Sequence, residues 1–374
     1  MIERFVPGAG GVENVAWQVA HALSRAGEDV TVFAREISPS ADVAHQRLPV
    51  SRLWQPLRVS NFSRAAARET RNVSQGDPRA FDVVHSFSRT RFQDLYRAGG
   101  GSHDDFLRRT HPGYRHWVRR LSPRHRTLLH LEAQVFADPS QRIQCASRFV
   151  ADALIEGQNV APDRILLLPN GVDLDRFAGD APSAAGAELR AELSPDAEQV
   201  WVFPASGWPR KGLSELLEAL ARLNDPGLQV WIAGRDDPQP WRQRAEKLGV
   251  ADSLRFIGDR ADLEIVYAGA DGMILPTRYD AFANVTLEAA AAGLPIITTA
   301  TNGAAEWLTP DLTLIDEACD PFLIADALAS LADPAERKIR GARLAERAKA
   351  FSWDVHIAAL REEYAAIVAR RKRQ

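Results

Sequence analysis

Cysteine is scarce in this chain of 374 residues, which contains only Cys145 and Cys319. Two thiols cannot form the disulfide framework of a small secreted domain, so they favour a reducing compartment. Each lies in or near an apolar run with no basic pocket beside it, and a buried, unreactive thiol is the better interpretation of both. Disulfide-rich extracellular proteins are therefore excluded.

Long apolar runs are missing as well. No stretch approaches the roughly 18 residues that span a bilayer, and the opening stretch MIERFVPGAGGVE lacks the apolar region of a signal peptide. We therefore expect a cytoplasmic protein. A large net charge is also absent, because 46 lysines and arginines face 49 acidic residues and leave a formal charge of −3. The molecule as a whole is thus not built to bind polyanions.

Charge is nevertheless spread unevenly along the chain. Arginine is concentrated in residues 89–126, where the only acids are Asp94, Asp104 and Asp105. Aromatic residues are interleaved with these arginines: Phe106, Tyr114 and Trp117. A solvated basic face and a contact with an anionic membrane surface or acceptor phosphates both fit this pattern. Nucleic acid is not an expected partner, because no fold signature for it accompanies the patch.

Apolar segments bounded by glycine or proline alternate with helical segments in two series, which predicts parallel sheets covered by helices. The length suits two domains, and the composition, 45% hydrophobic and 25% charged, suits full cores. The strands expected in the first series are 29–35, 81–87, 142–147 and 165–171; those in the second are 200–206, 228–234, 253–258, 272–276 and 295–299. Residues 179–199 look like the connection. The fold class is therefore α/β, with two Rossmann-like domains facing across a cleft.

The stretch RYDAFANVTLEAAAAGLP, residues 278–295, places two carboxylates around the start of a helix. Asn284 is a suitable N-cap, so the helix should run from about Val285 to Ala292. Its free N–H groups would favour an anion such as a phosphate. Glu288, in the first turn, could then accept hydrogen bonds from a ribose diol, and Asp280 would face the group beyond the phosphates. An acidic first turn that complements the helix dipole remains an equal alternative.

The stretch GWPRKG, residues 207–212, follows the first strand of the second series. Arg210 and Lys211 are adjacent cations in a Gly-bounded turn at a helix start, which suits a phosphate. A solvated basic turn is the alternative. Together with the helix after Asp280, these cations predict a site for a nucleotide diphosphate.

Two glycine-rich stretches lie in the first half. In GAGG, residues 8–11, Glu13 stands where a dinucleotide-binding motif needs its last glycine, so a tight turn and a close approach to a ligand are both open. In RAGGGSHDDF, residues 97–106, His103 could orient a sugar hydroxyl, or it could be a loop histidine. No second ligand cluster accompanies its acids, so no metal is expected.

These stretches together resemble a known family, the GT-B retaining glycosyltransferases of family 4. The motifs that carry the resemblance are ILLLPNGVDLDRF, GWPRKG, LRFIGDRADL and DAFANVTLEAAAAGLPIITT. The N-terminal part, with PGAGGVE and SRTRFQDLYRAGGGSHDDF, is most similar to the lipopolysaccharide-core glucosyltransferase branch. The family begins with a full strand before its Gly-rich turn, whereas only MIERFV precedes the turn here; a short first strand and a late start relative to the relatives both fit.

The resemblance implies two domains and a helix that returns to the first. It places the acceptor on residues 1–168 and the nucleotide-sugar on residues 169–352, with the returning helix over 353–374. It implies transfer of a hexose, glucose first, from a UDP-sugar to a saccharide or lipid-linked acceptor without metal or other cofactor. A sugar-nucleotide epimerase and a non-catalytic nucleotide-sugar-binding protein are the alternatives.

The resemblance also implies roles for the donor-side residues. Arg210 and Lys211 match the pair that neutralises the diphosphate leaving group. The family's carboxylates are usually Glu-x7-Glu; here Asp280, one methylene shorter, would contact the transferred sugar and Glu288 would hold the ribose. Arg260 lies where the base-binding loop falls.

Further positions match the family's backbone and acceptor-side groups. Three residues match the amides at the helix start: Asn284, Val285 and Thr286. Gly10 and Gly11 match the N-terminal loop near the donor phosphate and the acceptor. His103 is the best match for the residue that contacts the donor sugar, with Asp104 as a rival. Peripheral attachment to the inner face of the membrane through 89–126 is expected to accompany a lipid-linked acceptor.

Overall fold

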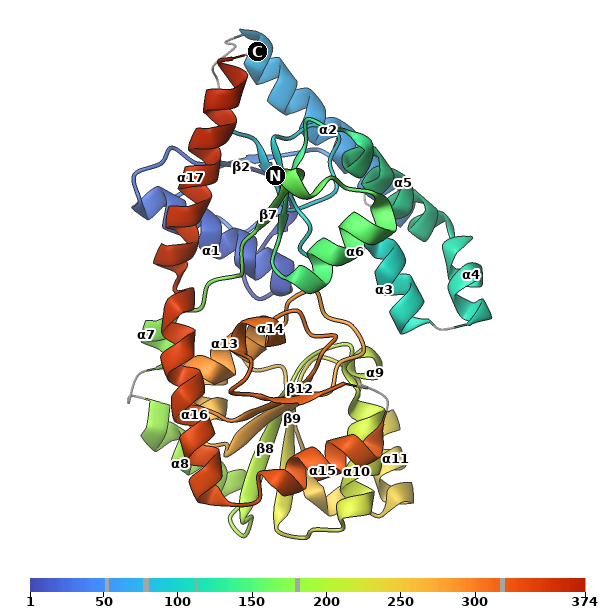
Figure 1. Cartoon of the computed structure of the whole chain (residues 1–374), viewed down its shortest axis with the longest axis vertical. Coiled ribbons are helices and arrows are strands. Elements are labelled where there is room, and N and C mark those ends of the chain that lie inside the picture. Colours follow the sequence, from blue (N-terminus) through green and yellow to red (C-terminus); the bar gives the residue numbers. More distant parts are fainter. Residues whose placement is uncertain (51–53, 77–80, 112, 179–181, 317–319, 374) are drawn as a thin grey trace. The chain divides into compact units, whose positions relative to one another are not determined.

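The chain forms two units that are described separately here (Figure 1). Unit 1 consists of Met1–Gly171 and Trp353–Gln374, and unit 2 consists of Val172–Ser352. The structure is a computed structural model and describes residues 1–374 except 51–53, 77–80, 112, 179–181, 317–319 and 374. None of the helices in these described ranges has the length and apolar character needed to cross a bilayer.

Unit 2 is built on one sheet of six strands, in the order β10-β9-β8-β11-β12-β13, with every pairing parallel. The strands are β8 (Gln199–Pro204), β9 (Leu228–Ala233), β10 (Leu254–Gly258), β11 (Gly272–Leu275), β12 (Ile296–Thr299) and β13 (Thr313–Ile315). All residues of β8, β11 and β12 are buried. Such near-continuous apolar strands are typical of a sheet with both faces covered.

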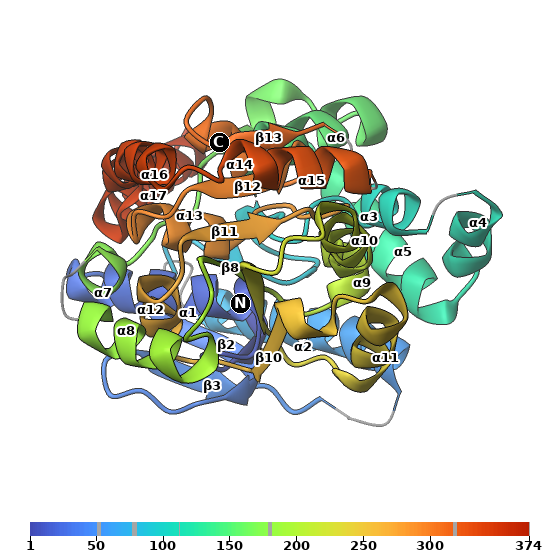
Figure 2. The same ribbon diagram turned by 90° about the horizontal axis from the view of Figure 1, so that it is seen from below.

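Helices cover both faces of this sheet (Figure 2). Along one face lie α9 (Trp208–Lys211), α10 (Leu213–Leu223), α11 (Gln239–Leu248) and α15 (Pro321–Ser330). Along the other lie α8 (Pro182–Leu193), α12 (Leu263–Ala268), α13 (Asn284–Ala291) and α16 (Pro334–Ala348). The remaining elements of unit 2 are short: α7 (Leu174–Phe177), α14 (Ala305–Leu308), and the 3-10 turns η2 (Ala251–Ser253) and η3 (Lys349–Phe351).

Unit 1 has two parallel sheets instead of one. The first, in the order β1-β2-β3, contains β1 (Ile2–Phe5), β2 (Thr31–Ile37) and β3 (Ala44–Arg47). The second, in the order β4-β5-β6-β7, contains β4 (His85–Ser86), β5 (Leu95–Arg97), β6 (Arg142–Cys145) and β7 (Ile165–Leu167). The two sheets meet at Met1, whose amino group donates to the His85 carbonyl at 2.6 Å and whose carbonyl accepts from the Phe87 amide at 2.8 Å.

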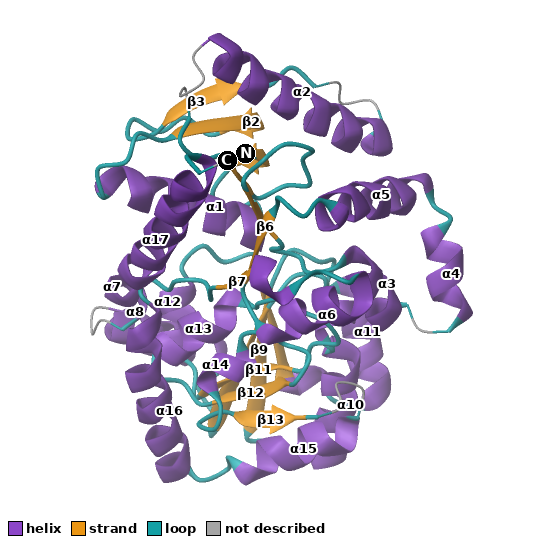
Figure 3. Cartoon of the chain, turned by 45° about the horizontal axis from the view of Figure 1, so that its top comes forward, coloured by secondary structure: helices purple, strands orange, loops and turns teal. Residues whose placement is uncertain are grey.

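Helices of unit 1 pack on both sides of these strands. They are α1 (Gly11–Arg25), α2 (Gln55–Gly76), α3 (His103–Thr110), α4 (Tyr114–Arg120), α5 (Pro123–Ala137), α6 (Arg148–Gln158), η1 (Pro162–Arg164) and α17 (Trp353–Arg371). The C-terminal α17 lies beside α1, and Leu360 and Ile367 share an apolar cluster with Val19 and Leu23 (Figures 1 and 3). Helix α4 lies at the outer edge of the unit in all three ribbon views (Figures 1, 2 and 3).

The predicted two-domain α/β fold with parallel sheets and a C-terminal helix is confirmed, but two expected segments differ. The strand expected over 81–87 is reduced to His85–Ser86. The connection expected over 179–199 contains a helix, α8, that packs within unit 2: Arg190 donates to the Asp271 carboxylate at 2.7 Å. Alanine-rich composition suggested a linker, whereas alanine is also the best helix former. Cys145 is buried, and burial raises the pKa of its thiol to about 12; Cys319 lies outside the described residues.

Candidate functional site

The strand order of unit 2 reverses beside its central strand. The chain runs outward from β8 to β9 and β10, and then returns to place β11 on the other side of β8. Ligands of open α/β sheets bind at such a switch point, outside the carboxyl ends of the strands. Two connecting segments leave β8 and β11 here, residues 205–212, which include α9, and residues 276–283; they are called the loops after β8 and β11 below. They carry the two motifs singled out from the sequence.

Three of the predicted residues meet between these loops. The Lys211 ammonium forms an ion pair with the Asp280 carboxylate, and an Arg210 guanidinium nitrogen lies 3.7 Å from the same carboxylate. Arg210 also donates to the Tyr279 carbonyl at 2.5 Å, and its own carbonyl accepts from the Arg278 amide at 2.9 Å. The loop after β8 is thereby fastened to the loop after β11, with two cations and one carboxylate at the switch point.

Burial and charge act against each other in this cluster. Only 7% of Lys211 is exposed. Burial lowers the pKa of the Lys211 ammonium, and the nearby Asp280 carboxylate opposes that effect. Burial alone would raise the pKa of Asp280, but the charges of Lys211 and Arg210 outweigh it and hold the pKa below its ordinary value. Asp280 is therefore ionised at neutral pH, and it supports a charged lysine in a position that water scarcely reaches.

The backbone of the loop after β8 is set by Gly212 and Asp236. Gly212 has φ of 84°, and a Cβ on it would collide with the Pro276 carbonyl, so only glycine fits between the two loops. Asp236, from the loop after β9, accepts hydrogen bonds from the Gly207 amide at 2.7 Å and the Trp208 amide at 3.2 Å. It thereby fixes the turn that presents both cations. The GRDDP stretch that contains Asp236 gave no sequence signal for this role.

Helix α13 begins one residue earlier than predicted. Ala283 is the N-cap and Asn284 the first helical residue, with no side-chain cap, so the expectation that Asn284 caps the helix is wrong. The amide of Thr286 donates to the Ala283 carbonyl at 2.9 Å and is therefore engaged within the helix. Of the three amides predicted to face an anion, those of Asn284 and Val285 are the better candidates. Glu288 consequently lies in the second turn and not the first.

Asn302 replaces the missing cap, and sequence reasoning did not find it. Its side chain, 1% exposed, accepts from the Ala283 and Ala304 amides at 3.2 Å each. The same amide group donates to the hydroxyls of Thr286 at 2.9 Å and Thr298 at 3.0 Å. Asn302 therefore holds the start of α13 against β12 from 19 residues further along the chain than Ala283. Such a tertiary cap leaves no local sequence pattern.

Glu288 lies near side chains of α7 and α12, Arg176 and Tyr267. Burial raises the pKa of the Glu288 carboxyl to about 7, although Arg176 and the Tyr267 hydroxyl work in the opposite direction. Arg176 is itself held by Glu264, at 2.8 Å from its Nε. A carboxylate poised near neutrality with a tyrosine hydroxyl beside it can accept hydrogen bonds from a pair of ligand hydroxyls when ionised. Tyr267 and Arg176 are partners of Glu288 that the sequence did not indicate.

Arg260 is not part of the cluster at the switch point. It follows β10, which is at the edge of the sheet, and forms a two-pronged ion pair with Asp262 at 2.8 and 2.6 Å. This pair fixes the guanidinium beside the start of α12. Across the described part of the chain, no three His, Cys, Asp or Glu side chains are arranged as metal ligands.

The other predicted residues belong to unit 1. Gly10 is the N-cap of α1 and Gly11 its first residue. The Gly8 amide donates to the Asn14 side chain at 2.6 Å, and the Gly10 carbonyl accepts from the Asn14 amide at 2.9 Å. The Gly-rich stretch is thus a tight turn closed by Asn14, and it leads directly into a helix N-terminus.

His103 is the first residue of α3 and is mostly buried. Its amide donates to Glu132 at 2.8 Å, and its ring nitrogen Nε2 lies 2.9 Å from Nδ1 of His125. Burial, with the charges of Arg89 next, lowers the pKa of His103 to about 3, so the ring is neutral at physiological pH. The rival Asp104 is engaged by Arg108 at 2.8 Å and by Arg120, which ties α3 to α4.

The fold has close counterparts among solved structures. A crystal structure of WaaG, a glycosyltransferase involved in lipopolysaccharide biosynthesis, matches with a TM-score of 0.81 at 22% identity, over 98% of this chain and 99% of that one. Anabaena HepE in complex with UDP-glucose matches with a TM-score of 0.73 at 15% identity, over 98% of each chain. The two-unit α/β fold is therefore of the GT-B type.

Family models place the chain more narrowly. Residues 187–350 match the model of the glycosyl transferases group 1, and residues 9–176 match the model of glycosyltransferase family 4. The chain is a glycosyltransferase and belongs to the families that these models describe. The predicted family resemblance is confirmed.

Two curated relatives show how broad these families are. The D-inositol 3-phosphate glycosyltransferase of Geodermatophilus obscurus is 29% identical over 96% of this chain and 85% of its own length. The lipopolysaccharide glucosyltransferase WaaG of Escherichia coli is 31% identical over 39% of this chain and 40% of its own length. Proteins similar to this chain thus act on different acceptors.

Proposed function

We propose that this glycosyltransferase transfers a hexose, with glucose as the first candidate, from a UDP-sugar to a saccharide or lipid-linked acceptor such as lipopolysaccharide core. We further propose that the transfer retains the anomeric configuration and needs no divalent metal. The observation that carries the proposal is the cluster of Arg210, Lys211 and Asp280 at the switch point of unit 2. UDP and UDP-glucose complexes of a protein with this fold, and the name of WaaG, support the choice of donor and acceptor.

In the proposed reaction, Arg210 and Lys211 stabilise the charge that develops on the departing diphosphate. Fixed cations in a site with little water are effective at this because they need no reorganisation during the reaction. Amides at the start of α13 add further positive potential, and Asn302 keeps them in place. Two cations at one diphosphate are the feature that makes a metal unnecessary in this proposal.

Asp280 has two proposed duties. Without donor, its charge opposes the burial that lowers the pKa of the Lys211 ammonium. With donor bound, the diphosphate takes over as counter-ion, and the carboxylate is then available to a hydroxyl of the transferred sugar. Asp280 is one methylene shorter than the glutamate that the family usually has here. This difference would set the distance between the carboxylate and the sugar hydroxyl. We therefore assign selection of the donor sugar to this position.

We propose the following bond changes, in line with the family resemblance. The bond between the sugar C1 and the diphosphate oxygen breaks, and the acceptor hydroxyl forms its bond to C1 on the same face. Its proton passes to the departing phosphate oxygen, so no protein base takes part. Glu288 holds the ribose diol, Arg260 the base, and the Gly10–Gly11 turn the donor phosphate. The neutral His103 ring hydrogen-bonds the transferred sugar.

The proposal is tested by nucleotide release from UDP-, GDP- and ADP-sugars, with and without extracted lipopolysaccharide core, in the presence of a chelator. Release that needs both a UDP-sugar and the acceptor supports it. Epimerised donor without acceptor would instead indicate an epimerase, and UDP binding without turnover on any acceptor a binding protein. Restoration of activity only when the chelator is replaced by Mg²⁺ would contradict metal independence.

We also propose that α4 brings the acceptor side to an anionic membrane. Large apolar side chains on and beside this helix are exposed: Tyr114 73%, Trp117 67%, Val118 60% and Leu121 73%. Arginines of the 89–126 segment flank them, and the helix lies at the outer edge of unit 1 (Figure 2). Aromatic rings and cations on one short helix suit the interface between lipid headgroups and acyl chains.

Vesicle co-sedimentation tests this second proposal. Vesicles with anionic lipid should carry the protein down, and neutral vesicles should not. The double variant Trp117→Ser, Leu121→Ser should lower the bound fraction severalfold, while Leu323→Ser, an exposed leucine of unit 2, should not change it. Equal sedimentation of the parent chain and the α4 variant with anionic vesicles would contradict the proposal.

A further inference from the structure

Arg176 lies on the short helix α7 and is fixed by several contacts within unit 2. Its Nε donates to the Glu264 carboxylate at 2.8 Å, and its Nη2 donates to the same carboxylate and to the Ala261 carbonyl. Its guanidinium carbon also lies 4.9 Å from the centre of the Phe177 ring. Because the guanidinium is a rigid planar fork, contacts in these directions leave it one orientation.

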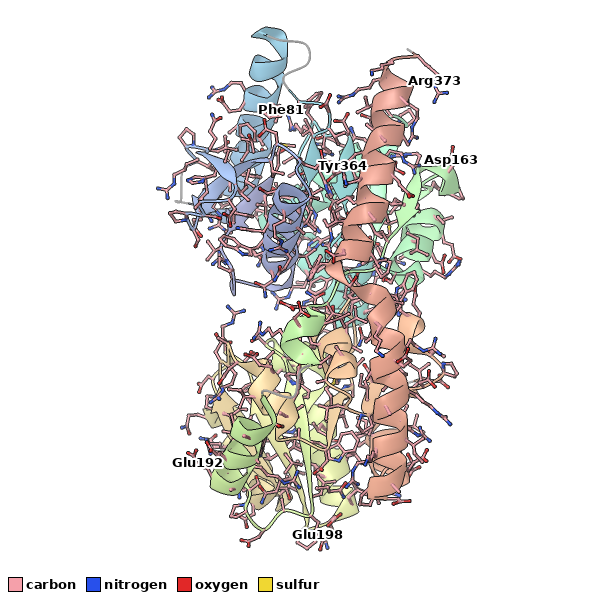
Figure 4. The ribbon with its side chains drawn as sticks, turned by 90° about the vertical axis from the view of Figure 1, so that its left-hand side faces the viewer. Phe81, Asp163, Glu192, Glu198, Tyr364 and Arg373 are labelled. Carbon is pink, nitrogen blue, oxygen red and sulfur yellow. The ribbon has the colours of Figure 1, made fainter. Side chains whose placement is uncertain are left out.

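Glu288, on α13, lies close to this ion pair. Helix α7 packs against α13, and α12 packs against α8, on which Figure 4 labels Glu192. The Tyr267 hydroxyl, on α12, donates to the Val285 carbonyl in the first turn of α13 at 3.4 Å. Burial raises the pKa of the Glu288 carboxyl to about 7; the charge of Arg176 and a hydrogen bond from Tyr267 oppose this effect, and the charge of Glu264 adds to it.

Three further elements pack on α13, namely α16, β11 and β12. None of their described residues is among the charged groups that shift the pKa of Glu288 appreciably. The charge state of this carboxyl therefore depends on its burial and on side chains from only two helices, α7 and α12.

Two carboxylates, those of Glu264 and Glu288, compete for Arg176. In the structure the side-chain hydrogen bonds of Arg176 go to Glu264 and to the Ala261 carbonyl. A guanidinium bonded directly to Glu288 would occupy the lone pairs that a ribose diol needs. A guanidinium held nearby still favours the ionised carboxylate through its charge, and it leaves those lone pairs available.

We propose that Glu264 is a positioning residue for nucleotide binding, which holds Arg176 near enough to Glu288 to favour the carboxylate and too far away to occupy it. Tyr267 orients the same carboxylate with its hydroxyl. This inference rests on the proposed role of Glu288 in binding the ribose. It goes beyond that role because it assigns control of nucleotide affinity to residues that act through Glu288.

The test removes each partner of the Arg176–Glu264 pair, since the two losses should have opposite effects. In the full chain with ¹³C-labelled glutamate, NMR follows the titration of the Glu288 carboxyl, and Glu288→Gln assigns its signal. Glu264→Gln removes a negative charge and frees Arg176 to approach Glu288, so the midpoint should fall by about one pH unit. Arg176→Ala removes the positive charge, so the midpoint should rise by about one pH unit. Tyr267→Phe should also raise it, by less.

A merely structural ion pair would behave differently, because loss of either partner would then move the Glu288 titration in the same direction. The matched control is Glu218→Gln, which breaks the half-exposed pair between Glu218 on α10 and Arg244 on α11. This control should leave the titration unchanged. Shifts in one direction for both variants of the Arg176–Glu264 pair, or no shift in either, would overturn the proposal.

UDP affinity, measured by titration calorimetry between pH 6 and pH 8, separates this inference from the proposed function. Arg176→Ala should bind UDP roughly fivefold more weakly at pH 7, because less of Glu288 is then ionised. Glu264→Gln should bind UDP severalfold more weakly even at pH 8, because Arg176 then occupies the carboxylate. Opposite titration shifts with UDP affinity unchanged in both variants would uphold the assigned contacts of Glu288. They would overturn its ribose role, and with it the control of nucleotide binding.

Discussion

Unit 1 and unit 2 have similar architectures but treat buried polar groups differently. In unit 2 the buried Lys211 is paired with Asp280, and the half-buried Arg190 with Asp271. In unit 1, Arg97 is 2% exposed, and its Nε and Nη1 have no hydrogen-bond partner among the described residues; Nε2 of His356 is in the same position. Among the described residues of unit 2, Oε2 of Glu215 is the one buried side-chain atom of this kind, and the others belong to unit 1. Unit 2 has one continuous sheet of six strands, whereas unit 1 has two sheets that meet at Met1. A fold can therefore be recognisable in both units while the interior of one is less completely hydrogen-bonded.

The largest effect should come from removing a cation of the paired cluster. Lys211→Ala takes away one of two charges proposed to stabilise the leaving group, and such losses typically lower turnover by roughly 10²–10³-fold. Initial-rate measurements with the donor identified by the release assay check this. Lys247→Ala, an exposed lysine on α11, is the control and should keep the parent rate. Turnover within about threefold of the parent chain for Lys211→Ala would remove that residue from the mechanism.

The next effect concerns the tertiary cap of α13. Asn302→Ala leaves the buried Ala283 amide and Thr286 hydroxyl without their partners, which costs on the order of 1–3 kcal/mol of unfolding free energy. Urea unfolding followed by hydrogen exchange of the peptides that contain the buried Trp201 and Trp231 reports on unit 2. Asn302→Asp retains the two accepted bonds and should lose less. An Asn302→Ala midpoint equal to that of the parent would show that the cap is not needed.

A smaller effect is expected at Glu288. Glu288→Ala should weaken UDP binding by roughly tenfold, the value of one hydrogen bond to a charged group. Because burial raises the pKa of Glu288 to about 7, UDP affinity should fall between pH 8 and pH 6 as the carboxylate takes up a proton. Titration calorimetry at both pH values checks this, and Glu288→Gln should bind weakly and without that pH dependence. An affinity of the parent chain that does not change with pH would contradict the ribose role.

The smallest expected effect is a difference between unit 1 and unit 2 in how their stability depends on pH. All nine histidines belong to unit 1, and burial lowers the pKa of His103 to about 3 and of His356 to about 4. Below pH 6.5 these histidines take up protons in the unfolded state but stay neutral in the folded state. Protonation therefore favours unfolding, and unit 1 should lose stability as the pH falls from 7 to 5. In unit 2, Glu288 binds its proton more readily when folded, which acts in the opposite direction. Hydrogen exchange by peptide should therefore speed up in unit 1 alone; equal acceleration in both units would rule this out.

The sequence predicted the second α/β series well because its strands are short, apolar and bounded by glycine or proline. The cation pair and Asp280 also followed from their positions after strands. Asn302 and Tyr267 could not be predicted, since each acts on α13 from an element that only the tertiary fold brings near. The strand expected over 81–87 failed for a related reason: apolar β-branched residues become a strand only where a neighbouring strand pairs with them.

Helix α17 has a consequence for how the protein is made. Its residues Leu360 and Ile367 complete a core begun by Val19 and Leu23, so the first 171 residues lack part of their interior until the last helix is synthesised. At about 5–20 residues per second, a ribosome needs on the order of 10–40 s to translate the 181 residues of Val172–Ser352 that lie between. The second unit, although later in the message, is the first that can finish folding. During that interval the nascent first unit presents the apolar face of α1, and it is the stage at which a chaperone would be needed most.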